Sequence, residues 1–249
     1  MRVDIRVLIE QCYYINFEQT SDYMHQMKQC TTMGNYDLLE QLLQKCANLP
    51  DFQYGVGKQA YTYQQGVVQL KKYKNAAKAL EYFNEALRTF SLMDETGSER
   101  LHIFTIEEIG INTDKATCLF TLGQRQEAIE LLTTSVESRL ANYENVETLH
   151  ILRAYFYLAQ FYLQEKNYVK CIEIATKGIN LSNCKFVYIY AGDLNATKAT
   201  ALHFLGDEEH ATFHFRRAYE FYNLLGSSRI STMPVSYTHL RAHETLSDL

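Results

Sequence analysis

Two pairs of histidines stand four residues apart, His210 with His214 and His239 with His243. On an α-helix this spacing places both imidazoles on one face, where they can bind a transition metal. We predict no metal site at either pair. The first pair flanks the apolar seam of a predicted helix, which favours a solvated or helix-capping role. The second pair lies in a tail whose sequence has another explanation.

The tail at residues 235–245 reads V-S-Y-T-H-L-R-A-H-E-T. This string resembles a translated reading frame of the transposase adapter used in sequencing libraries, and the residues on either side, Pro234 and 246–249, fit the neighbouring bases. Translated adapter sequence is excluded from fold reasoning. We therefore expect 234–249 to be a non-native tail, and the gene to be truncated at its 3′ end.

Other catalytic and metal-binding patterns are missing from the sequence. It contains no Gly-rich phosphate loop, no G-x-S-x-G elbow and no H-E-x-x-H motif. Glu107 and Glu108 follow Thr105 at the predicted start of a helix, where carboxylates favour the helix dipole. The six cysteines form no C-x-x-C pair, which indicates reduced thiols. We predict that the chain is not an enzyme and has no cofactor and no bound metal.

The composition argues against a nucleic-acid-binding protein and a membrane protein. Hydrophobic residues make up 47% of the chain and the net charge is −5, so a core is available and the basic footprint of a nucleic-acid-binding domain is missing. No segment is apolar and long enough for a secretory signal or a membrane span. We expect a cytoplasmic protein that contacts neither membrane nor nucleic acid directly.

Internal periodicity is the strongest signal in the sequence. Five turn-like segments begin at Gly34, Lys74, Gly123, Lys166 and Gly206. Small or apolar residues follow each at offsets of five, nine and twelve: Leu39, Leu43, Cys46; Ala79, Phe83, Ala86; Ala128, Leu132, Ser135; Cys171, Ala175, Gly178; and Ala211, Phe215, Ala218. Such spacings place the three residues on one helix face, where small side chains let neighbouring helices approach closely.

A matching register precedes three of the turns. Ala116, Ala159 and Ala199 each stand seven residues before a turn, and an apolar or aromatic residue follows each of them three positions later. This pattern predicts the first helix of a helical hairpin, and the seam after the turn predicts the second.

The segments L-G-x-x-x-x-A-I-E-L-L at 122–132 and L-G-D-x-x-x-A at 205–211 resemble tetratricopeptide repeats. The intervals between turns exceed the usual 34 residues of that family, and its common tryptophan is absent. We predict an all-α tetratricopeptide-like helical-hairpin solenoid, a right-handed superhelix of about five helix pairs. Residues 1–20 would form a joining or first helix and 21–233 the repeat domain, with a polar linker at 93–100.

The stretch E-E-I-G-I-N-T-D-K-A at 107–116, continuing to Ala128, is similar to the regulatory domain of Rgg/PlcR-type, XRE-family transcription regulators of Gram-positive bacteria. K-G-I at 177–179 and R-A-Y-x-F-x-x-x-L-G at 217–226 resemble the last helices of those domains. The likeness covers about 22–230. In that family a helix-turn-helix domain precedes the repeats; this sequence lacks it. The resemblance implies a peptide-sensing domain and a possible homodimer.

Helical solenoids bind ligands on the concave face formed by the first helix of each pair. The repeat register places Tyr61, Gln64, Val68, Thr113, Thr117, Phe120, Arg153, Phe156, Gln160, Thr200 and His203 on that face, with Asn112 and Asn195 near its edge. Amides and hydroxyls can meet the backbone of an extended peptide, Arg153 can pair with a carboxylate, and Phe120 and Phe156 can receive apolar side chains. For each residue taken alone, a solvated or helix-packing role is the competing interpretation.

Two functions remain. The first is a ligand-sensing regulatory domain of a bacterial transcription regulator, in which a short peptide changes the packing of the repeats or the geometry of a dimer. The alternative is a tetratricopeptide-type adaptor that binds a segment of another protein and has no DNA-linked role.

Overall fold

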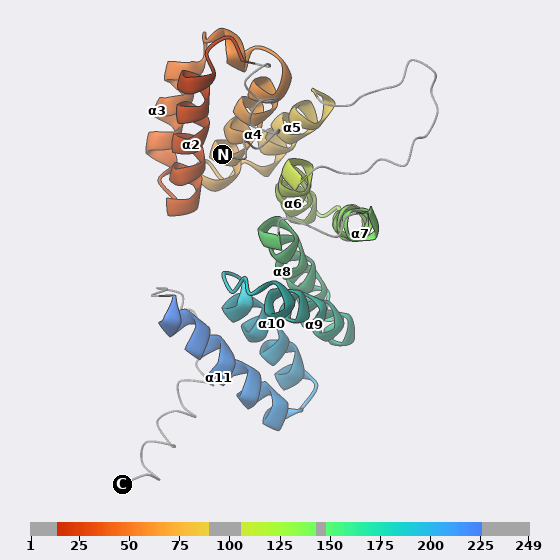
Figure 1. The fold of residues 1–249 in the computed structure, drawn as a ribbon. Coiled ribbons are helices and arrows are strands. Elements are labelled where there is room, and N and C mark those ends of the chain that lie inside the picture. The colour runs from red at the N-terminus through yellow and green to blue at the C-terminus, as the bar shows by residue number, and fades with distance from the viewer. Residues whose placement is uncertain (1–13, 90–105, 143–147, 226–249) are drawn as a thin grey trace. The chain divides into compact units, whose positions relative to one another are not determined.

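The structure is a computed structural model that describes residues 14–89, 106–142 and 148–225 (Figure 1). Within these ranges the chain forms ten α-helices and one short 3-10 helix, and no strand. The helices are α2 (Phe17–Met33), α3 (Tyr36–Cys46), η1 (Pro50–Phe52), α4 (Gly55–Lys71), α5 (Ala76–Arg88), α6 (Ile106–Thr121), α7 (Arg125–Asn142), α8 (Thr148–Gln164), α9 (Tyr168–Lys185), α10 (Ala191–Phe204) and α11 (Glu208–Leu224). The all-α prediction is therefore confirmed.

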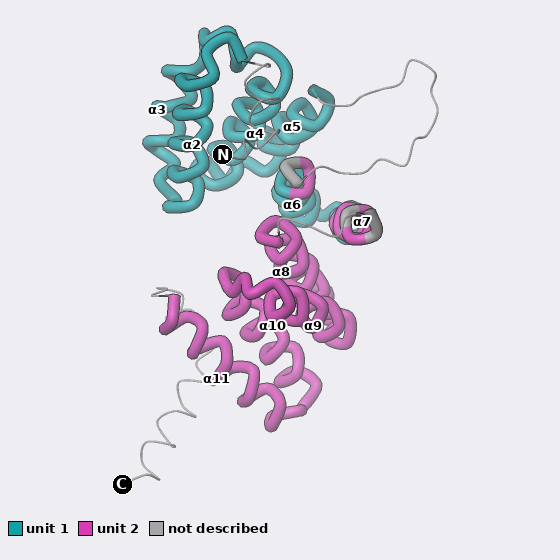
Figure 2. Tube along the Cα trace, in the orientation of Figure 1, with its two compact units in different colours: residues 1–103, 110–131 teal, residues 104–109, 132–249 magenta. Residues whose placement is uncertain are grey.

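The chain divides into two compact units (Figure 2). Unit 1 comprises Met1–Ile103 and Gly110–Leu131, and unit 2 comprises Phe104–Ile109 and Leu132–Leu249. The superhelix through both units remains a prediction. The predicted polar linker, the adapter-like tail with His239 and His243, and most of the predicted first helix lie outside the described residues.

All five predicted turns join two helices, and their first residues share one backbone conformation. Gly34, Lys74, Gly123, Lys166 and Gly206 have φ angles of 71°, 55°, 88°, 57° and 81°. This left-handed conformation lets the chain leave one helix and start the next, and glycine adopts it without steric cost. At Lys74 and Lys166 the same turn forms with a residue that tolerates it less well.

The residue after the left-handed position starts the second helix of the hairpin. Asn35, Asn75, Asn167 and Asp207 accept a hydrogen bond from the backbone N–H three residues later, at 3.0 to 3.2 Å. Such N-caps satisfy one of the unpaired N–H groups at a helix start. In the third hairpin the side chain of Gln124 instead contacts Glu127, at 3.1 Å.

The predicted seam is the closely packed face of each second helix. All fifteen seam residues are buried, and the three alanines of the first helices are fully buried. The same position, seven residues before the turn, holds Met27 in α2 and Val67 in α4, both 1% exposed. The register detected in three hairpins therefore extends to all five.

Glycine allows close approach of helices both within a hairpin and between successive hairpins. A Cβ atom at Gly66 of α4 would lie 2.5 Å from Cε1 of Phe83 in α5. In unit 2, a Cβ atom at Gly178 of α9 would lie 2.9 Å from Cδ1 of Leu194 in α10. Both distances are too short for a carbon–carbon contact, so these positions bring the helices closer than alanine would allow.

A buried carboxylate holds the start of α2 in unit 1. Asp51, in η1, is 4% exposed. Its Oδ1 accepts a hydrogen bond from the N–H of Ile15 at 2.7 Å, and its Oδ2 accepts from the N–H of Asn16 at 2.9 Å and from the hydroxyl of Thr20 at 2.7 Å. Burial alone would raise the pKa of Asp51, but these three bonds outweigh it and lower the pKa. The first hairpin is thereby fixed to the loop before α4.

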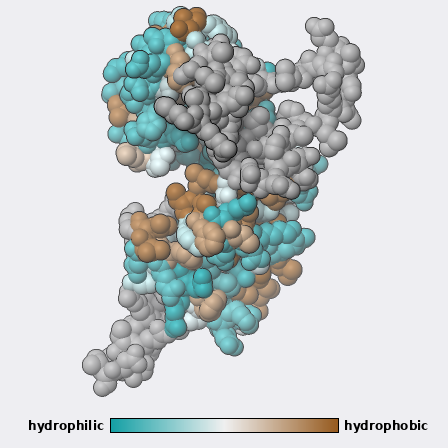
Figure 3. Space-filling model, viewed as in Figure 1, coloured by the Kyte–Doolittle hydropathy of each residue, from teal (hydrophilic) through white to brown (hydrophobic). Residues whose placement is uncertain are grey.

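The surface of the described residues is mixed in polarity. Figure 3 shows hydrophilic residues over much of the visible face, interrupted by separate hydrophobic patches. Within the described ranges, every helix is too short or too polar to cross a membrane.

Candidate functional site

The first helices of the two hairpins in unit 2, α8 and α10, carry six of the predicted ligand-binding residues, and all but the buried Asn195 are at least partly exposed. Arg153, Phe156 and Gln160 are spaced three and four residues apart and share one face of α8, and Thr200 and His203 share one face of α10. Arg153, Phe156, Gln160 and Thr200 are half-buried and His203 is exposed. We refer to these five residues as the α8–α10 face.

An aromatic cluster surrounds the α8 part of this face. The ring of Phe156 stacks on Tyr190 with centroids 5.9 Å apart and 28° between planes, and lies 5.2 Å from the ring of Tyr157. The guanidinium of Arg153 lies 5.8 Å from the centroid of Tyr157. Aromatic faces attract a guanidinium and hold it in a defined orientation, so this cluster pre-positions a positive charge beside apolar rings.

Hydrogen bonds join the two helices of the face. Nε2 of Gln160 donates to the hydroxyl of Thr197 on α10 at 2.7 Å, and that hydroxyl donates to the carbonyl of Asp193 at 2.8 Å. Thr200 donates to the carbonyl of Ala196 within its own helix at 2.9 Å. Gln160 therefore already links the hairpins, and its amide oxygen is the part available for further bonds.

His203 and Asn195, the other two predicted residues of α10, have different surroundings. Nδ1 of His203 lies 2.7 Å from Oε1 of Glu208, at the exposed end of the hairpin. Asn195 is 1% exposed. Its Nδ2 donates to the carbonyl of Ala191 at 2.8 Å, and its Oδ1 lies 2.8 Å from Nδ1 of His214 on α11. Asn195 thus ties α10 to α11 beneath the surface.

In unit 1 the predicted residues are mostly enclosed. Asn112 and Thr113 of α6 are 1% and 0% exposed, Phe120 is 7% exposed and Val68 of α4 is 3% exposed. The Thr117 hydroxyl donates to the carbonyl of Thr113 at 2.9 Å. These side chains offer little surface to a ligand.

Tyr61 and Gln64 are the other predicted positions of unit 1, and both contact neighbouring elements, as Phe120 does. The ring of Tyr61 packs at 6.0 Å from that of Phe52, and burial raises the pKa of Tyr61. Oε1 of Gln64 accepts from the Thr31 hydroxyl of α2 at 2.9 Å. The guanidinium of Arg125 lies 5.3 Å from the ring centroid of Phe120. The α8–α10 face is therefore the more open of the predicted surfaces.

Sequence reasoning missed Tyr157, Tyr190 and Thr197. Tyr157 adjoins Phe156 and was not projected onto the face, and Tyr190 precedes α10 in a loop that the repeat register does not cover. Thr197 lies three residues before Thr200, a helical spacing that would have suggested it.

The first histidine pair does not act as one unit. His210 lies beside the N-cap of α11, with its Nδ1 2.8 Å from Oδ1 of Asp207, which agrees with a capping role. His214 is half-buried against Asn195. Among the described residues, no group of three or more His, Cys, Asp or Glu side chains is arranged to hold a metal ion.

Comparison with known proteins gives structural likeness only. No protein-family profile matches the chain, and no curated protein matches its sequence. The structure resembles Bacillus thuringiensis PlcR in complex with the peptide PapR7 and DNA, with a TM-score of 0.74 and 15% identity over 90% of this chain and 76% of PlcR. The apo form of PlcR gives a TM-score of 0.69 with 15% identity, over 89% of this chain and 77% of that one.

Two further structures are similar to a lesser degree. The TPR-like repeats of a putative kinesin light chain from Podospora anserina give a TM-score of 0.57 and 14% identity, over 84% of this chain and 96% of theirs. MamA from Desulfovibrio magneticus RS-1 gives 0.51 and 17% identity, over 82% of this chain and 95% of that one. At such low identities the likeness establishes the fold, which is tetratricopeptide-like.

Proposed function

We propose that this chain is a peptide-sensing regulatory domain of a bacterial transcription regulator, and that a short peptide with a free carboxylate binds the α8–α10 face. The observation that carries the proposal is the position of half-buried Arg153, whose guanidinium lies beside the ring cluster of Phe156, Tyr157 and Tyr190. A guanidinium recognises a carboxylate through two parallel hydrogen bonds, and the rings offer apolar contact to a neighbouring side chain.

The fold supports the proposal, because PlcR in its complex with PapR7 has a similar structure. That likeness concerns the fold alone, and the side chains of unit 2 supply the chemistry for binding.

The link between Gln160 and Thr197 suggests how binding would be transmitted. This hydrogen bond joins α8 to α10 across two hairpins. A peptide amide that competes for Gln160 would change the packing of α8 against α10. A ligand shifts such an equilibrium only by its difference in affinity for the two packings. The same peptide binding would also change the geometry of a homodimer.

The experiment is a titration of the purified chain with a panel of short apolar peptides, each supplied as the free acid and as the C-terminal amide. We expect saturable binding of at least one acid, and affinity weaker by roughly ten- to hundredfold for its amide and for Arg153→Ala, the scale of a lost charge-assisted hydrogen bond. Lys177→Ala removes an exposed cation on α9 and serves as the control. Absence of saturable binding, or equal affinities for acid, amide and variant, refutes the proposal.

An adaptor function is the alternative, favoured by the likeness to kinesin light chain repeats. An adaptor would bind longer segments and would not depend on a terminal carboxylate. Acid and amide forms of one peptide therefore separate the two functions.

A further inference from the structure

A cluster of basic side chains lies between α10 and α11 and includes none of the five residues of the α8–α10 face. His214 and Arg217 are one helical turn apart on α11, and Asn195 and Lys198 are one turn apart on α10. The contact between Nδ1 of His214 and Oδ1 of Asn195, at 2.8 Å, brings these two helix faces together. All four side chains are buried or half-buried.

Lys198 and Arg217, the two cations of this cluster, form no ion pair with a carboxylate among the described residues. The guanidinium of Arg217 lies 5.9 Å from the ring centroid of Phe213 and 5.8 Å from that of Phe221. Lys72 of unit 1, by contrast, is neutralised, because its Nζ lies 2.6 Å from Oδ1 of Asp37 and 2.8 Å from Oε2 of Glu40.

Burial and the neighbouring positive charges oppose protonation of His214. Burial lowers the pKa of Lys198. Burial also lowers the pKa of His214 to about 4, and the neighbouring charges of Lys198, Arg217 and His210 add to this effect. His214 is therefore neutral at pH 7, and an anion placed among these groups would relieve the repulsion and raise its pKa.

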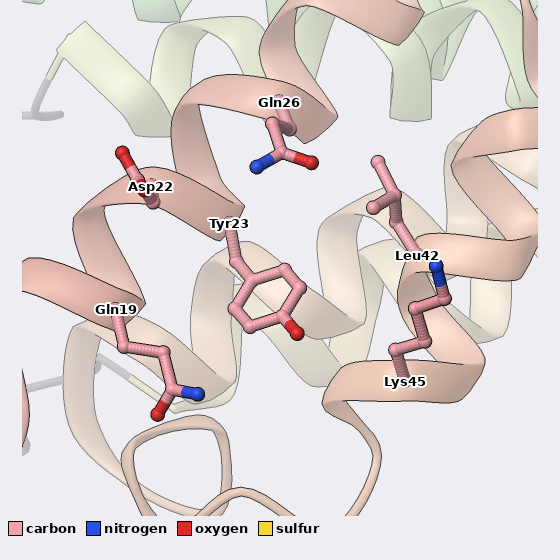
Figure 4. Close-up of a pocket in the computed structure, with 6 residues that line it drawn as sticks. All are labelled: Gln19, Asp22, Tyr23, Gln26, Leu42 and Lys45. Atoms are coloured by element: carbon pink, nitrogen blue, oxygen red, sulfur yellow. The ribbon is translucent and has the colours of Figure 1, made fainter.

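The equivalent place in the first hairpin is hollow. Counted from the turn residues Gly34 and Gly206, the positions of Asn195, Lys198, His214 and Arg217 correspond to Tyr23, Gln26, Leu42 and Lys45. Those four residues, with Gln19 and Asp22, line a groove of about 280 Å³ between α2 and α3 (Figure 4). The repeat thus brings these four positions to one surface of the hairpin, and the last hairpin has three basic residues there in place of one.

We propose that the surface formed by Asn195, Lys198, His214 and Arg217 binds the carboxylate of a small ligand that also carries an aromatic or apolar group. Arg217 and Lys198 supply the positive charge, protonated His214 supplies a further donor, and the rings of Phe213 and Phe221 flank the apolar part. This site shares no residue with the α8–α10 face and does not depend on the proposed peptide binding.

The test uses N-acetylphenylalanine as the ligand and N-acetylphenylalanine amide as the uncharged comparison. The imidazole signals of His214 in the full chain, assigned with His214→Gln, are followed by NMR as each compound is added. We expect the acid to shift these signals saturably and to raise the pKa of His214 toward the ordinary value of about 6.5. Binding then takes up a proton, so affinity is about tenfold tighter near pH 5.5 than near pH 7.5.

Two register-matched variants provide the controls. Arg217→Met keeps an unbranched apolar stem beside the rings and removes the charge, and it should weaken binding at least tenfold. Lys45→Met makes the same kind of change at the corresponding position of the first hairpin and should leave binding unchanged. An equal response to acid and amide, or binding of the acid with no change in the pKa of His214, overturns the proposal. A parallel titration with inorganic phosphate that gives the same saturable shift and the same dependence on Arg217 would show a general oxyanion site and overturn the carboxylate assignment.

Discussion

Replacing Asp51 by asparagine tests how the first hairpin is fixed. The carboxylate accepts three hydrogen bonds, from the N–H groups of Ile15 and Asn16 and from the hydroxyl of Thr20. An amide oxygen can replace one carboxylate oxygen, but the NH₂ group then faces a donor. Since a hydrogen bond to a charged group contributes about 1.5–3 kcal/mol and an unsatisfied buried donor costs about 1–3 kcal/mol, we expect Asp51→Asn to lower the free energy of unfolding by about 2–4 kcal/mol.

The pH dependence of the free energy of unfolding provides an independent check on the role of Asp51. The pKa of Asp51 is lower in the folded state than in the unfolded chain, where it is about 3.9. A lowered folded pKa means that the stabilisation is complete above the unfolded pKa and is lost as the pH falls through the folded pKa. The difference in stability between parent and Asp51→Asn should therefore be constant above about pH 5 and shrink on acidification.

The assay is urea unfolding followed by far-ultraviolet circular dichroism across this pH range. Asp22→Asn, which removes an exposed carboxylate from α2, should behave like the parent. A loss below about 0.5 kcal/mol for Asp51→Asn, within the range of ordinary surface substitutions, would refute the assigned role of the carboxylate.

Three further substitutions test the hairpin construction by the same unfolding assay. Gly178→Ala should destabilise unit 2 by about 1–3 kcal/mol, because the added methyl meets Leu194; an unchanged midpoint would show that α9 and α10 can separate freely. Lys166→Gly should stabilise by up to about 1 kcal/mol, because the left-handed turn then carries no Cβ strain, and destabilisation would contradict this reading of the turn. Asn75→Ala should cost about 1 kcal/mol through the lost N-cap of α5, whereas Asn75→Asp should retain most of the parent's stability.

Much of the hairpin construction could be predicted from sequence because it depends on local chemistry. Left-handed turn residues, N-caps and small seam residues all lie within twelve positions of Gly34, Lys74, Gly123, Lys166 or Gly206. Asp51 could not be found in this way. Its partners are 31 to 36 residues away in the sequence, and a single aspartate before an aromatic residue has no distinctive spacing.

The candidate site was harder to predict because periodicity gives the direction of a side chain but not what covers it. Thr113 and Gln160 both occupy predicted inward positions, yet Thr113 is fully buried and Gln160 is half-buried with a bond to Thr197. The burial of Asn195 depends on His214 of the next helix, a contact that helical register alone does not reveal. Tyr190 lies in an irregular loop, where no repeat pattern operates.

Hydrogen–deuterium exchange of the full chain, with and without a free-acid peptide selected from the apolar panel, tests the proposed function most directly. We predict that the bound peptide slows amide exchange in α8 from Arg153 to Gln160 and in α10 from Thr197 to His203, and that Arg153→Ala abolishes this protection. Protection confined to α2 and α3, or protection that persists in Arg153→Ala, would contradict it.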